Sequence, residues 1–170
     1  MYPFLKGHGT ENDFVLLPDH DGTVHGGLSP EAWSARVRAL CDRRAGIGGD
    51  GVLRVVRGED GHWFMDYWNA DGSVSEMCGN GIRCFVKYAI DRGIVPNSGA
   101  SVSVETLAGI RQVAPISEDG QITRARVSMG MPIFTPNDVP VKLEPAGEFG
   151  SGPVLNHPFQ MDCYDLPLTF

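Results

Sequence analysis

The first part of the chain alternates a short apolar run with a helical repeat of apolar positions. Residues 12–17, NDFVLL, form an apolar run that ends at Pro18, which predicts a first strand. Residues 29–30, Ser-Pro, are typical of a helix start. The amphipathic helix that they begin has apolar positions at Trp33, Val37 and Leu40. The stretch GIGGDG at 46–51 has too many glycines to stay helical, so we expect this helix to stop near Gly46.

Two strands and a second helix are predicted next. Residues 51–56 and 63–68 are rich in β-branched and aromatic side chains, which favours strands. The segment 69–73, NADGS, predicts a turn, because its Asp-Gly pair suits positive backbone dihedrals. A broad apolar face then predicts a mostly buried helix that ends at Gly93. Its apolar positions are Ile82, Phe85, Val86, Tyr88, Ala89 and Ile90.

The remaining pattern is that of β structure followed by an irregular segment. Residues 101–106 alternate with period two, 110–113 do so more weakly, and 124–129 form a further candidate strand. Residues 132–158 are rich in proline and glycine and have little periodicity. The order of elements predicts an α/β (α+β) fold, with a mixed β-sheet wrapped around a central helix.

Composition and charge narrow the classes of function. The 170 residues are 42% hydrophobic and 21% charged, with a formal net charge of -7, which is typical of a soluble globular protein. The sequence has no cluster of Lys and Arg residues, so we do not expect nucleic acid as a partner. The N-terminus lacks the pattern of a secretory signal, and no run reaches the roughly 18 apolar residues of a membrane span, so we expect a cytoplasmic protein.

The four cysteines raise the question of a metal site, a disulfide or a catalytic thiol. Cys78 and Cys84 are six residues apart, a wider spacing than in common zinc knuckles, and no second close pair completes a zinc site. A disulfide between them would have to join different faces of the second helix, which argues against this pairing. Cys41, Cys84 and Cys163 fit the pattern of small apolar core residues.

Cys78 differs because the turn Gly79-Asn80-Gly81 places it at the start of a helix. Free backbone N–H groups and the helix dipole favour an anion there, either a thiolate or the carboxylate of a ligand. On these residues alone, an inert cysteine before a glycine-rich helix cap is an equally open interpretation.

Four motifs together resemble the diaminopimelate epimerase family. They are GTENDF at 9–14, GIGGDG at 46–51, NADGS at 69–73 and MCGNGIRC at 77–84. Proline racemases and related isomerases share a similar cysteine turn, but the segments around Asn12 and Asn69 favour the epimerase. The resemblance extends from near Phe4 to about Gly130.

This resemblance implies interconversion of LL- and meso-diaminopimelate, on the route to lysine and peptidoglycan, without a cofactor and without a metal. A cysteine thiolate removes the α-proton, and a second cysteine returns a proton to the opposite face. Carried over to this sequence, the catalytic residue is Cys78, and Gly79 and Asn80 hold the substrate's α-carboxylate. Asn12 and Asn69 contact the substrate, although each has the alternative of serving only a turn.

The chain also departs from this family. The family's polypeptide has two similar halves with one catalytic cysteine in each, and Cys163 lacks the glycine turn of a second site. We therefore expect residues 1–130 to form an N-terminal epimerase domain and residues 131–170 to be a linker and the start of a second domain. The missing half, or a second copy in a homodimer, would then be the partner, and an unpaired sheet edge would favour association.

Position 51 is a further departure. Gly51 stands where many members of the family have a side chain, often glutamine, that contacts the substrate, so this contact is not expected here. Two other interpretations stay open: a related isomerase of the proline racemase or phenazine-biosynthesis type, and a domain that retains the fold without the reaction.

Overall fold

Strand β2 (Asn12–Pro18) is apolar at consecutive positions because both of its faces are covered. The computed structural model describes residues 3–58, 61–135, 138–139, 157–161 and 164–168. Phe14 and Leu16 pack in one hydrophobic cluster, and Val15 and Leu17 pack in another on the opposite face. A strand that is buried on both sides has a continuous apolar sequence, as β2 does.

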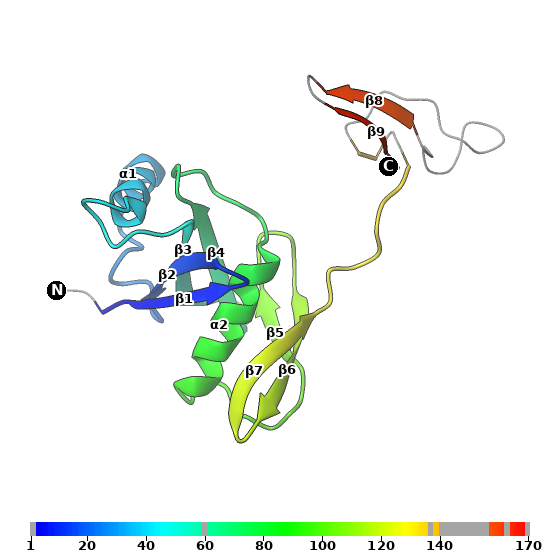
Figure 1. The fold of residues 1–170 in the computed structure, drawn as a ribbon. Coiled ribbons are helices and arrows are strands. Elements are labelled where there is room, and N and C mark those ends of the chain that lie inside the picture. The colour runs from blue at the N-terminus through cyan, green and yellow to red at the C-terminus, as the bar shows by residue number, and fades with distance from the viewer. Residues whose placement is uncertain (1–2, 59–60, 136–137, 140–156, 162–163, 169–170) are drawn as a thin grey trace. The chain divides into compact units, whose positions relative to one another are not determined.

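A mixed sheet of seven strands forms the framework of the described residues (Figure 1). The strands lie in the order of the sequence, and the β2–β3 and β4–β5 pairs are parallel, whereas the other neighbours are antiparallel. Besides β2, they are β1 (Leu5–Gly9), β3 (Gly51–Arg57), β4 (Trp63–Asn69), β5 (Val102–Glu105), β6 (Arg111–Glu118) and β7 (Gln121–Val127).

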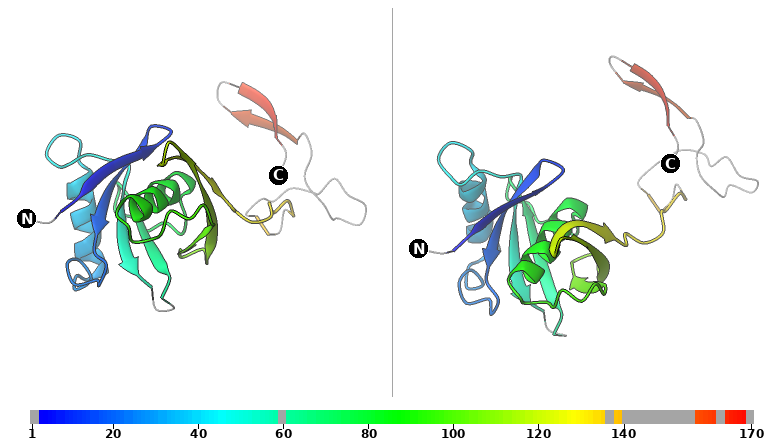
Figure 2. Two further views of the ribbon diagram at one scale, coloured as in Figure 1. Left: turned by 90° about the horizontal axis from the view of Figure 1, so that it is seen from below. Right: turned by 60° about the horizontal axis from the view of Figure 1, so that its bottom comes forward.

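Helix α2 (Gly79–Asp91) lies within the curve of this sheet, between the first strands and β6–β7 (Figure 2). Its side chains Ile82, Phe85 and Val86 are fully buried and belong to the same cluster as Phe14 of β2. Removing such apolar area from water is the main favourable contribution to folding. The sheet wrapped around a central helix confirms the predicted α+β fold.

Helix α1 (Pro30–Cys41) covers the other face of β2 and β3. Trp33, Val37 and Cys41 pack in the second cluster with Val15 and Val52. The side chain of Ser29 accepts a hydrogen bond from the N–H of Ala32 at 3.2 Å, so the predicted N-cap is present.

The prediction that this helix extends to near Gly46 is wrong, since α1 ends at Cys41. The Asp42 carboxylate accepts the backbone N–H groups of Arg44 and Ala45, at 2.7 and 2.8 Å. A short acidic side chain that satisfies nearby N–H groups competes with the helix and stops it.

Strand β1 was not predicted, because its sequence LKGHG has no apolar alternation. It forms by pairing with β2 in a tight hairpin in which Gly9 lies opposite Asn12. The two turn residues, Thr10 and Glu11, have φ of 57° and 68°. Positive φ at both positions is the conformation of a type I′ hairpin turn, and here both positions are occupied by residues other than glycine or asparagine.

The chain divides into two compact units, Met1–Met129 and Gly130–Phe170. In the second unit, β8 (His157–Met161) and β9 (Tyr164–Leu168) form an antiparallel pair. Cys163 lies outside the described residues. Neither of the described helices is long and apolar enough to cross a membrane.

Candidate active site

Several predicted site residues meet at one end of the sheet because strand termini converge there. Asn12 begins β2, and Asn69 ends β4 opposite Gly51, the first residue of β3. Strands β2 and β3 are parallel, and Phe14 lies opposite Gly51. Cys78, just before α2, faces the same end, since its Sγ lies 4.0 Å from Asn12 Oδ1.

Cys78 is the N-cap residue of α2. Its backbone is extended, with φ of -141° and ψ of 114°, and its Sγ accepts the backbone N–H of Gly81 at 3.3 Å. Oxygen side chains usually occupy this position, and the amide donor favours negative charge on the sulfur. In the described part of the chain, the N–H groups of Gly79 and Asn80 have no hydrogen-bond partner. The helix start can therefore hold an anion beside the thiol.

The second glycine of the turn allows close packing of α2 on the sheet. A Cβ at Gly81 would lie 3.1 Å from Leu53 Cδ2 and 3.3 Å from Cys78 Cβ. A Cβ at Gly79, by contrast, would meet no heavy atom within 4 Å. Gly81 thus fits the packing below the thiol, whereas Gly79 borders open space.

Asn12 and Asn80 belong to a chain of polar side chains beside Cys78. Asn80 Nδ2 donates to Asn12 Oδ1 at 3.2 Å, and Asn12 Nδ2 donates to Asp50 Oδ2 at 2.8 Å. Arg83 donates to Asn80 Oδ1 and, at 3.0 Å, to Thr10 Oγ1 in the β1–β2 turn. The structure therefore brings Asn12, Asn80 and Cys78 together.

Asn69 is held on both sides of its carboxamide. The Tyr67 hydroxyl donates to Asn69 Oδ1 at 2.8 Å, and Asn69 Nδ2 donates to Ser73 Oγ at 3.0 Å. Ser73 Oγ in turn donates to the Asp71 carboxylate at 2.6 Å. A carboxylate only accepts, so Ser73 Oγ must donate to Asp71 and can accept from Asn69 Nδ2. The Asn69 oxygen then faces Tyr67, whose hydroxyl donates to it.

Tyr67 is a site residue that the sequence reasoning missed. Burial and, to a smaller extent, the nearby Cys78 raise the pKa of the Tyr67 hydroxyl to about 12. This group therefore stays protonated at neutral pH. Tyr67 and Asn69 are two residues apart on β4 and therefore share one face of the sheet. This alternation, read back from Asn69 along the strand, is the signal by which Tyr67 could have been found.

The glycine at position 51 makes room for Tyr67. A Cβ there would lie 2.6 Å from Tyr67 Cε2, 2.6 Å from the backbone oxygen of Trp68 and 3.2 Å from the Tyr67 hydroxyl. The aromatic side chain thus occupies the space beside position 51.

We expect the Gly51→Ala variant to lose about 1–3 kcal/mol of unfolding free energy, because the methyl group meets a backbone oxygen that cannot move cheaply. The measurement is urea unfolding of both proteins. Gly27→Ala is the matched control, since a Cβ at Gly27 has no heavy atom within 4 Å, and its effect should stay within about 0.5 kcal/mol. Equal stability of the wild type and Gly51→Ala would contradict this assignment of the space.

The other described cysteines are free thiols in apolar surroundings. Cys41 is 5% exposed, and burial raises the pKa of its thiol to about 11. Burial also raises the pKa of Cys84, which packs against the cluster around α2. Their surroundings agree with the predicted role as core residues.

An ionic cluster adjoins the start of β2. Asp13 pairs with Arg43 at 2.6 Å and with Lys6 at 2.7 Å, and Arg43 also pairs with Asp50 at 2.8 Å. Hydrogen bonds from Arg43 and Lys6 hold the pKa of Asp13 well below its usual range. The cluster joins the loop after α1 to the strand that carries Asn12.

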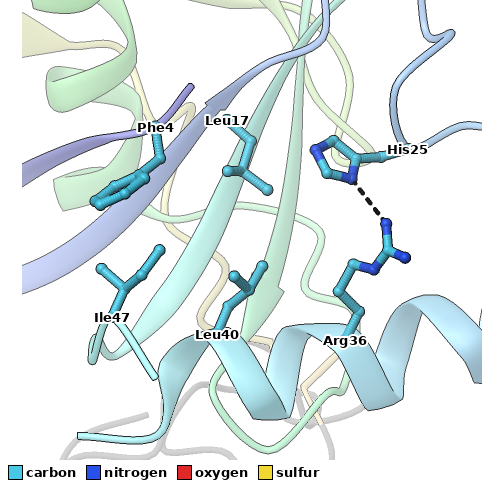
Figure 3. A pocket seen from close by; sticks show the side chains of 6 residues that line it. All are labelled: Phe4, Leu17, His25, Arg36, Leu40 and Ile47. Carbon is cyan, nitrogen blue, oxygen red and sulfur yellow. Dashed lines mark hydrogen bonds between the residues drawn. The ribbon is translucent and has the colours of Figure 1, made fainter. Parts of the chain in front are cut away.

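A cavity of about 370 Å³ lies elsewhere, between α1 and the first strands (Figure 3). Arg36 and Leu40 project into it from α1, and Arg36 bonds to His25 at 3.3 Å. The residues that line it are Phe4, Leu17, His25, Arg36, Leu40 and Ile47. None of the predicted site residues lines this cavity. Among the described residues, no group of three or more His, Cys, Asp or Glu is placed to hold a metal ion.

Solved structures share this arrangement of sheet and helix. A probable proline racemase from Agrobacterium radiobacter K84 has a TM-score of 0.60 at 17% identity, covering 76% of this chain and 42% of that one. A hydroxyproline epimerase from Agrobacterium vitis has a TM-score of 0.56 at 14% identity, covering 74% and 40%. The described residues therefore have a fold that racemases and epimerases use.

Sequence comparison defines the family. The family model for diaminopimelate epimerase matches residues 4–135. The diaminopimelate epimerase of Thermobifida fusca is 52% identical over 141 residues, covering 75% of this chain and 47% of the relative. That of Corynebacterium glutamicum is 48% identical over 141 residues, covering 78% and 48%. The chain belongs to the diaminopimelate epimerase family, as its motifs predicted, and spans about half the length of these relatives.

Proposed function

We propose that this chain supplies one side of a cofactor-independent active site that epimerises LL- and meso-diaminopimelate. The observation that carries the proposal is the position of Cys78. Its sulfur caps α2 and accepts the Gly81 N–H, next to the N–H groups of Gly79 and Asn80, which have no partner among the described residues. A reactive thiol and an anion site are thus adjacent, as removal of a proton beside a carboxylate requires.

In the proposed reaction, the substrate's α-carboxylate accepts hydrogen bonds from the N–H groups of Gly79 and Asn80. The Cys78 thiolate takes the α-proton and becomes a thiol, and the electron pair of the broken C–H bond is delocalised into the carboxylate. Donors fixed before the reaction stabilise the developing charge without reorganisation. In the reverse direction the Cys78 thiol returns a proton to the same face.

The proton on the opposite face comes from a second cysteine. We assign that cysteine to the kind of segment that the matched relatives have outside their alignment with this chain, which covers 48% and 47% of their length. We propose that Asn12 and Asn69 contact the substrate, because their carboxamides border the thiol and Tyr67. The product would serve lysine and peptidoglycan synthesis in the cytoplasm, with neither nucleic acid nor a membrane as partner.

Substrate protection of Cys78 tests this proposal on the chain itself. We expect meso-diaminopimelate at tens of millimolar to slow alkylation of Cys78 by iodoacetamide at least about twofold, since the bound carboxylate covers the helix start. L-Proline and L-lysine at equal concentration are the controls and should protect less. Equal protection by L-proline would favour the proline racemase type, and no protection by any of the three would argue against a substrate site at Cys78.

A further inference from the structure

We propose that Asp50 is a positioning residue that holds the Asn12 carboxamide with its oxygen facing Cys78. This inference rests on the proposed function of Cys78, and it concerns how the thiol is prepared. Asp50 lies in the glycine-rich GIGGDG segment and its hydrogen bonds within the described residues go to Asn12, Asp13 and Arg43 rather than to Cys78, so it would act through Asn12.

One end of the polar chain is determined by Arg83. A guanidinium only donates, so the Asn80 atom that it contacts must be the oxygen. The Asn80 Nδ2 group then points to Asn12, where it needs an acceptor, and the Asn12 oxygen lies 3.2 Å away. The opposite orientation of Asn12 would place two NH2 groups against each other.

The other end is determined by Asp50. Its Oδ2 accepts from Asn12 Nδ2 at 2.8 Å and from the backbone N–H of Asp13 at 3.0 Å. Hydrogen bonds from Asn12 and then from the Asp13 N–H lower the pKa of Asp50, which keeps it a carboxylate at neutral pH. A carboxylate only accepts, so the Asn12 NH2 group must face Asp50. A donor-only group and an acceptor-only group thus allow a single orientation of both amides.

The consequence reaches the sulfur. The Asn12 oxygen lies 4.0 Å from Cys78 Sγ, at the long limit for a hydrogen bond from a thiol. An oxygen there favours the thiol, whereas the Gly81 N–H, which the sulfur accepts at 3.3 Å, favours the thiolate. If Asn12 turned over, its NH2 group would face the sulfur and favour the thiolate further. By orienting Asn12, Asp50 keeps one hydrogen-bond acceptor and one hydrogen-bond donor beside the Cys78 sulfur. Such surroundings suit a group that both takes and gives a proton.

Four variants separate orientation from charge. We expect Asp50→Ala to raise the rate constant of Cys78 alkylation at pH 7.5 about fivefold, the value of one net hydrogen bond, because Asn12 loses one of the two partners that fix its orientation and turns over more often. Asp50→Asn removes the charge but keeps one oxygen, which faces the two donors Asn12 Nδ2 and Asp13 N–H in preference to the single donor Arg43, so its rate should stay within about twofold of wild type. Arg43→Ala is the matched control, since it removes the ion pairs of Arg43 with Asp50 and Asp13 and leaves the Asn12–Asp50 hydrogen bond in place. Asn12→Ala removes the amide itself.

The double variant tests whether Asp50 acts through Asn12. In the Asn12→Ala background, Asp50→Ala should produce no further change, because coupled residues are not additive. An equal effect of Asp50→Ala in both backgrounds, or equal rates for Asp50→Asn and Asp50→Ala, would overturn the proposal. Thermal unfolding of each variant checks the fold, and Asp50→Ser replaces Asp50→Ala if the latter does not fold.

These outcomes are distinct from a failure of the proposed function. If wild-type Cys78 reacts no faster than Cys41 and Cys84, the role of Cys78 itself is wrong. If wild-type Cys78 is selectively reactive but insensitive to Asp50→Ala, only the positioning role of Asp50 is wrong.

Discussion

We expect iodoacetamide to modify Cys78 at least about tenfold faster than Cys41 or Cys84 in the folded chain at pH 7.5. The reacting species is the thiolate, so the rate depends on thiolate stability and on access. Cys78 is partly exposed, and its sulfur accepts the Gly81 N–H at the start of α2.

The other two thiols ionise less readily, and Cys41 is also buried, whereas Cys84 is partly exposed like Cys78. Burial raises the pKa of Cys41 to about 11, so at pH 7.5 roughly one thiol in three thousand is ionised. Burial raises the pKa of Cys84 as well, and Cys84 packs against the core around α2. A thiol that is mostly protonated reacts slowly even where the reagent can reach it.

Mass spectrometry of tryptic peptides over a time course measures the three rates in one sample. Cys163→Ser in all samples removes the fourth thiol. The same protein in 8 M urea is the control, because unfolding should bring the rates within about threefold of one another. Equal rates in the folded protein would contradict the account of the Cys78 surroundings.

The framework of the fold was predictable where burial leaves a pattern. The apolar face of α2 predicted a central helix, and the run in β2 reflects coverage by α2 on one side and α1 on the other. Strand β1 left no such pattern, because LKGHG is ordered by pairing with β2 rather than by its own apolar side chains. The glycines suggested that α1 ends near Gly46. The helix ends earlier because the Asp42 carboxylate accepts the N–H groups of Arg44 and Ala45.

The candidate site shows a similar division. The glycine turn predicted that Cys78 begins a helix, and the structure places it at the N-cap of α2. The environment of Asn12 was beyond local reasoning, because Asp50 is 38 residues away in sequence and meets Asn12 only through the parallel pairing of β2 and β3. Likewise, the sequence indicated only that Gly51 lacks a side chain to contact the substrate. The structure shows that the Tyr67 side chain occupies the space beside position 51.

A chimeric enzyme allows the chemistry of Cys78 to be measured within a complete active site. Residues 4–135 of this chain would replace the matching segment of the diaminopimelate epimerase from Corynebacterium glutamicum, which is 48% identical in this region. The relative supplies the remainder of its own sequence, and this chain supplies Cys78 with its surroundings. The unaltered relative and the chimera with Cys84→Ala are the positive and matched controls.

The deciding measurement is exchange of the α-proton of LL- and meso-diaminopimelate in deuterated water by this chimera. We predict that deuterium enters with formation of the other epimer, and that Cys78→Ala lowers the rate of epimer formation by about a hundredfold to ten-thousandfold, as expected for loss of an acid–base group. Cys84→Ala should leave the rate within about threefold of the parent chimera. An active chimera that retains its rate after Cys78→Ala would contradict the assignment of Cys78 as the proton-transferring group.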